Sequence, residues 1–68
     1  MAYTVTSGFY ALVSIYFEGS GSIDMSGTNI NINGGYHEIL MDEGDTLNLT
    51  LSPGPATLRH RAREYGRP

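Results

Sequence analysis

Apolar and polar residues alternate at every second position through most of this chain, and that pattern constrains its fold more than any other feature. The clearest runs are TNININ at 28–33 and TLNLTLS at 46–52. Successive side chains of a β-strand point to opposite faces of the sheet, so a two-residue period predicts strands with one buried face. Short segments rich in glycine, serine and aspartate separate the runs, as tight connections require. We therefore expect an all-β fold.

The number of runs predicts five to six short antiparallel strands in a small sandwich or barrel-like roll. Short connections favour a meander, in which consecutive strands pair in order. The expected turns are 19–22, the Asn33-Gly34 dipeptide and 42–45, because glycine and asparagine tolerate the positive φ that hairpin turns need. The inward positions of the runs predict this core: Phe9, Val13, Ile15, Phe17, Ile30, Ile32, Leu47, Leu49 and Leu51.

The run FYALVSIYFE at 9–18 is apolar on both of its faces. A strand with one face in water normally alternates with polar residues on that face. Here Tyr10, Leu12 and Tyr16 occupy the second face. Such a strand is either packed centrally or contacts another chain, and contiguous exposed apolar residues typically mark a contact surface. We interpret this second face as a candidate interface.

Charge divides the chain into a β-domain at 1–54 and a basic C-terminal arm at 55–68. All four arginines lie in the arm and the chain has no lysine, whereas six of the seven acidic residues precede the arm. An arm of this kind is expected to dock onto an acidic surface, on its own domain or on a neighbouring subunit. The alternative of a disordered terminus is the common fate of chain ends.

The conformation of the arm is open from the sequence. Leu58, Ala62 and Tyr65 recur at helical spacing, and Pro55 and Gly66 suit the first helical position and the position after the end. Eleven residues are too few for a stable isolated helix in water. We expect either a short helix or an extended segment.

The chain has 68 residues and no cysteine, which excludes disulfides, thiolate zinc sites and a cysteine nucleophile. A chain this short buries only about 60% of its unfolded surface, and small domains without such links often gain stability from oligomerisation. The N-terminal apolar run lacks a basic start and is interrupted by threonine and serine, which predicts no secretion signal, no membrane partner and cytoplasmic synthesis.

No pattern predicts an enzyme, a metal site or a cofactor. The nucleophile elbow and the phosphate-binding glycine motifs are missing. His37 and Glu38 point to opposite faces of a strand and cannot easily share an ion. The acidic turn at 42–45 lacks the spacing of a calcium loop.

Asn29, Asn31 and Asn33 share one face of a predicted strand, although asparagine is depleted in strands. They form a candidate polar binding face for a sugar or for the backbone of a partner. A solvent-exposed face explains the same alternation more simply.

Arginine and tyrosine are enriched at the hot spots of protein interfaces. The predicted partner-binding residues combine the arm with the second face of the 9–18 run: Arg59, Arg61, Arg63, Tyr65, Arg67, Tyr10, Leu12 and Tyr16.

The predicted function is a non-enzymatic structural or assembly protein, a small β subunit that docks onto protein subunits of its own kind or of a larger complex. By analogy of size and charge layout, virion components of the phage minor capsid or decoration type fit this profile. One alternative is a small nucleic-acid-binding regulator that uses the arginines, disfavoured because the acidic body repels a polyanion. The others are a protein inhibitor and a carbohydrate-binding β module.

Overall fold

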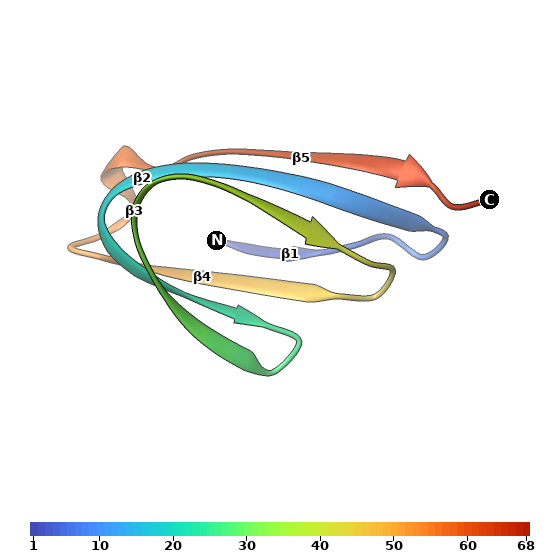
Figure 1. Cartoon of the computed structure of the whole chain (residues 1–68), viewed down its shortest axis with the longest axis horizontal. Coiled ribbons are helices and arrows are strands. Elements are labelled where there is room, and N and C mark those ends of the chain that lie inside the picture. The colour runs from blue at the N-terminus through green and yellow to red at the C-terminus, as the bar shows by residue number, and fades with distance from the viewer.

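The computed structural model describes all 68 residues and consists almost entirely of antiparallel β-strands (Figure 1). The strands form one five-stranded sheet that is not closed. The all-β class expected from the alternation is confirmed. The elements are β1 (Ala2–Thr4), β2 (Phe9–Met25), β3 (Thr28–Met41), β4 (Thr46–Ser52), the 3₁₀ turn η1 (Pro55–Thr57) and β5 (Arg59–Gly66).

Strand β2 is the centre of the sheet. It pairs with β3 along nearly its whole length, with β5 along Phe9–Tyr16 and with β4 along Ser20–Met25. Strand β1 pairs only with β4, which gives the order β1-β4-β2-β3 with β5 beside the first half of β2. The expected meander is wrong, because β4 and β5 both return to β2 instead of pairing with the strands that precede them.

Strands β2 and β3 form one long hairpin that bends in the middle, where both ribbons curve round together (Figure 1). The pairing register shifts between Phe17 and Ser20 at this bend. Gly19 has a φ of 98°, and a Cβ atom there would overlap the carbonyl oxygen of Ser52. A Cβ on Gly34 would lie 2.9 Å from the carbonyl oxygen of Gly19. Glycine is therefore needed at both positions because two backbones approach closely.

Two of the expected turns are wrong for this reason. Residues 19–22 lie inside β2 and Asn33-Gly34 lies inside β3, so these two strands are long instead of short. The turn of the hairpin is Ser26-Gly27, where both residues have positive φ. The third expected turn, 42–45, does connect β3 to β4.

The core is a single cluster to which both halves of the bent sheet contribute. Five of the expected residues are in it, while Ile32 and Leu51 are only partly buried against it. Phe9 is 37% exposed at the start of β2 and Ile30 is 50% exposed on β3, so these two expectations are wrong. The nine buried residues are Val5, Ala11, Val13, Ile15, Phe17, Ile23, Met41, Leu47 and Leu49.

The bend gives the sheet two separate outer surfaces. One covers β5, the first half of β2 and the end of β3; the other covers β1, β4, the second half of β2 and the start of β3. The structure contains no helix with the length and apolar character needed to cross a lipid bilayer.

Candidate functional site

The first outer surface gathers tyrosines and arginines from three strands. In the central strand β2, the side chains that point away from the buried Ala11, Val13 and Ile15 are those at every even position. Their partners in β5 and β3 share that face because paired residues of antiparallel strands project to the same side. We call this surface the tyrosine–arginine face: Tyr10, Leu12, Ser14 and Tyr16 of β2, Arg59, Arg61, Arg63 and Tyr65 of β5, and Tyr36, Glu38 and Leu40 of β3.

The C-terminal arm is extended and not helical over 59–66, and it lies on the domain itself as β5. Its docking is an eight-residue strand pairing with Phe9–Tyr16 and not a charge contact. Two-residue alternation places Arg59, Arg61 and Arg63 on one face, where they form no ion pair. The fourth arginine, Arg67, is the only one that pairs with an acidic residue of the same chain.

Apolar side chains on this face are unusually open to solvent. Leu40 is 69% exposed and Tyr36 is 62% exposed. The rings of Tyr10 and Tyr65 stack across the β2–β5 pair with centroids 5.2 Å apart. The hydroxyl of Tyr36 donates to Oγ of Ser14 over 3.3 Å. Three of the four tyrosines of the face are therefore held by neighbours on the same face.

A shallow depression lies at the centre of the face because Ser14 is the smallest side chain there. It has a volume of about 380 Å³. A smaller one of about 190 Å³ adjoins it between Tyr16, Tyr36 and Arg59. The larger depression is lined by Leu12, Ser14, Tyr36, Glu38, Arg61 and Arg63. A partner side chain entering it would meet a cationic wall from β5 and a tyrosine and a carboxylate from β3.

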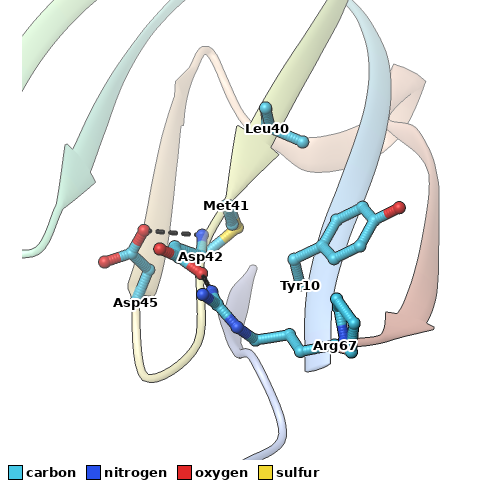
Figure 2. Close-up of a pocket in the computed structure, with 7 residues that line it drawn as sticks. Tyr10, Leu40, Met41, Asp42, Asp45 and Arg67 are labelled. Carbon is cyan, nitrogen blue, oxygen red and sulfur yellow. Dashed lines mark hydrogen bonds and ion pairs between the residues drawn. The ribbon is translucent and has the colours of Figure 1, made fainter. Parts of the chain in front are cut away.

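Arg67 closes one end of the face. Figure 2 shows its side chain crossing beside Tyr10 to form an ion pair with Asp42 in the turn after β3. The backbone N–H of Glu43 and the guanidinium of Arg67 hold the pKa of Asp42 below its ordinary value. A cavity of about 420 Å³ lies here, lined also by Leu40, Met41, Asp45 and Pro68. Arg67 is thus engaged within the chain, unlike the other three arginines.

A second carboxylate ties β5 to the far strand β1. Oε2 of Glu64 accepts hydrogen bonds from the hydroxyl of Tyr3 at 2.5 Å and from the backbone N–H and hydroxyl of Thr6, both at 3.0 Å. These donors lower the pKa of Glu64, the Tyr3 hydroxyl most strongly. Lost hydration and the neighbouring carboxylate raise the pKa of Tyr3 to about 12. The free sides of β1 and β5 are linked in this way.

Most of the acidic side chains accept hydrogen bonds from groups of the same chain. Besides Asp42 and Glu64, Glu43 accepts from the backbone N–H of Gly8 and from Ser7, and Asp45 accepts from the backbone N–H of Asp42. Glu18 and Glu38 accept no hydrogen bond. These carboxylates keep their charge, and only Asp42 is paired with an arginine.

Three residues of the face were missed by sequence reasoning: Tyr36, Glu38 and Leu40. The run YHEILM at 36–41 does alternate, with these three on one side. Only its pairing with β2 reveals that this side continues the tyrosine face. His37 points inward, where its half-buried ring stacks on Phe17 with the ring centroids 5.9 Å apart. The other predicted partner-binding residues share the face or, for Arg67, its end.

The asparagine row lies on the second outer surface. Asn29, Asn31 and Asn33 are exposed and pair with Asp24, Ser22 and Ser20 of β2. None of the four surface cavities is lined by these asparagines. We call this surface the asparagine face; it also contains Thr46, Asn48, Thr50 and Ser52 of β4 and Ala2 and Thr4 of β1.

No group of three or more histidine, aspartate or glutamate side chains is arranged to hold a metal ion. Comparisons with protein-family models, with curated proteins and with solved structures find no match to this chain. The functional proposal therefore depends on the geometry of the faces.

Proposed function

We propose that this chain is a non-enzymatic assembly subunit that docks onto a neighbouring protein subunit through the tyrosine–arginine face. The observation behind the proposal is the convergence on one face of three unpaired arginines with four tyrosines and Leu40, which is 69% exposed. Arginine and tyrosine are enriched among the few residues that dominate binding energy at protein interfaces, and exposed apolar side chains gathered on one face are typical of interaction sites.

The charge of the face indicates the chemistry of its partner. Arg59, Arg61 and Arg63 outnumber the single acid of the face, Glu38. Only Asp42 of this chain is paired with an arginine, and that arginine is Arg67, so we place the acidic complement of Arg59, Arg61 and Arg63 on a different protein. We therefore propose an acidic partner with apolar groups that cover Tyr36 and Leu40. A compact open roll in a larger particle, such as a virion, is the setting that the small size supports.

The test is quantitative capture of partners from cells that produce the protein. Arg59→Ala, Arg61→Ala and Arg63→Ala together remove three positive charges from the face. Asn31→Asp, Asn33→Asp and Asn48→Asp together add three negative charges to the asparagine face, so the two variants have the same net charge. We expect the arginine variant to lose an acidic protein partner that the wild type and the asparagine variant retain. Equal capture by both variants would contradict the proposal.

Single-stranded nucleic acid is the second candidate partner. One observation favours it: arginines alternate beside tyrosines on an open sheet face, an arrangement on which bases can stack and phosphates can pair. Its signature is distinct, because binding to a polyanion falls steeply with salt. If the wild type recovers material that absorbs at 260 nm and the arginine variant does not, the partner is nucleic acid and not protein.

A further inference from the structure

Three strands of the sheet have a free edge, and they differ in how that edge is protected. Strand β1 has only three residues, and β5 has three arginines. Strand β3 has 14 residues, no proline and a single formally charged residue, Glu38. Natural proteins block exposed edges by shortness, charge or proline, because an unpaired edge is a template for another strand. The edge of β3 lacks these protections.

Exposed apolar side chains concentrate on the same strand. The three most exposed large hydrophobic residues of the molecule are Leu40, Tyr36 and Ile30, at 69%, 62% and 50%, and all three belong to β3. Across the sheet, the free sides of β1 and β5 are joined by the hydrogen bonds of Glu64. No side chain makes a comparable link from β3, whose His37 bonds only to the carbonyl of Asn33 in the same strand. The free sides of β1 and β5 are thus linked by hydrogen bonds, whereas the free side of β3 is linked to no other strand.

We propose that two copies of this chain pair antiparallel along Tyr36–Leu40 of β3, about a two-fold axis at Glu38. In this register Tyr36 of each copy lies opposite the partner's Leu40, so both contacts are apolar and the interface is self-complementary. The backbone groups of both edges then satisfy each other. A second copy is also the occupant that a domain with only nine buried residues would use for stability.

Charge distinguishes this pairing from the two others that the edges of β3 and β5 allow. A β5–β5 pairing brings the three arginines of one copy against those of the other. A β5–β3 pairing is heterologous and would build a ring or an open filament instead of a dimer. The β3–β3 pairing has one like-charge contact, Glu38 with its counterpart, and leaves the arginines at the far edges. Tyr36 and Leu40 belong to both proposed contacts, but the arginines of β5 belong only to the docking and the backbone edge of β3 only to the dimer, so each proposal can fail without the other.

A single cysteine tests the register directly, because the chain has no cysteine of its own. Directly opposed side chains of an antiparallel pair have Cβ atoms about 4.5–5.5 Å apart, close to the separation in a disulfide. We expect Glu38→Cys to form a covalent dimer rapidly under mild oxidation. The matched control is Arg61→Cys, at the equivalent level of the other edge, which remains reduced. Equal oxidation of both variants would overturn the proposal.

Light scattering behind a sizing column tests the dimer itself. The wild type is expected to be a dimer whose mass is insensitive to salt, and Leu40→Arg is expected to weaken it about tenfold or more. Because Leu40 is exposed, its replacement leaves the fold of each copy intact, and the unfolding temperature falls only through the loss of the dimer. A wild type that is monomeric at millimolar concentration, or filaments that Arg61→Glu dissolves, would overturn the proposal. The triple arginine variant keeps the dimer while losing the acidic partner, which separates the two proposals.

Discussion

The two outer surfaces of the sheet come from the same pair of strands and yet have opposite character. The first half of β2 points Tyr10, Leu12 and Tyr16 outward, whereas its second half points Ser20, Ser22 and Asp24 outward. Both halves have the same core beneath them, so the needs of folding do not explain the difference. Serine, asparagine and threonine are sufficient on a strand face that lies in solvent, as the asparagine face shows. The apolar residues of the other face therefore point to a purpose outside the domain.

The bend that separates the two faces is where we expect the largest effect. Gly19→Val would force a β-branched side chain into a positive φ and against the carbonyl oxygen of Ser52. We expect a loss of about 3 kcal/mol or more in the free energy of unfolding, or no folded protein. Urea denaturation measures it. Gly66→Ala, where no atom lies within 4 Å, is the control and should cost little. Equal losses would show that the bend does not depend on close approach.

Acid and alkali should weaken the contacts that hold β5 and the following Arg67, because the groups that make them titrate. The pKa of Glu64 and that of Asp42 are lowered in the folded state, so their stabilisation is complete above the ordinary carboxyl range and is lost as pH falls through their folded pKa values. Tyr3 behaves oppositely: its pKa is raised to about 12, so its contribution is complete below its ordinary pKa and is lost as pH rises through about 12. Thermal unfolding between pH 3 and 12 should show both losses.

Tyr3→Phe is the control for this pH dependence. It should remove the alkaline loss and shift the acid loss of Glu64 toward its ordinary range, because the phenol is the largest cause of the lowered pKa. An unchanged alkaline profile in this variant would contradict the role of the Tyr3–Glu64 contact.

Replacing tyrosines by serine should make the tyrosine–arginine face more polar, as the asparagine face is. Tyr16→Ser with Tyr36→Ser removes exposed rings that contribute little to the core, so the free energy of unfolding should change by about 1 kcal/mol or less. Affinity for the captured partner should fall about tenfold or more if these rings are hot spots. Calorimetric titration with that partner measures the change. Unaltered affinity would restrict the interface to the arginines.

The smallest effect is expected on the asparagine face. Asn29→Ala with Asn31→Ala removes two exposed amides that line no cavity, so partner binding and unfolding should both remain near wild type. The same titration and urea measurements apply. A marked loss of binding would show that the asparagine face is part of the interface and that the two surfaces do not differ in function.

Sequence periodicity predicted the strands and the centre of the core, because Val13, Ile15, Leu47 and Leu49 lie where alternation alone decides burial. It did not distinguish a bend from a turn. Asn33-Gly34 has the chemistry of a hairpin turn, and only the close approach of Gly34 to Gly19 reveals its place in a bent strand. Exposure at edges was also hidden, since Ile30 has the same pattern as a buried residue but has no strand beyond it.

For the candidate site, the residue types were predictable and their assembly was not. Arg59, Arg61 and Arg63 also alternate as a strand requires, but the competing helical spacing of Leu58, Ala62 and Tyr65 left the conformation open. The extended conformation is determined by a long-range contact, the pairing of β5 with β2. Tyr36 and Leu40 join the face through another such pairing, which no local pattern contains.

The central position of β2 also has a kinetic consequence. The β2–β3 hairpin is local and can form early, whereas β5 reaches β2 only by closing a loop that spans at least Tyr16 to Arg59. Closure of so long a loop is entropically costly, so folding dominated by such contacts is slow. We expect β5 to join last and to detach first. In hydrogen exchange, the amides that β2 shares with β5 should then be less protected than those it shares with β3. The tyrosine–arginine face is thus also the part of the sheet that we expect to be completed last.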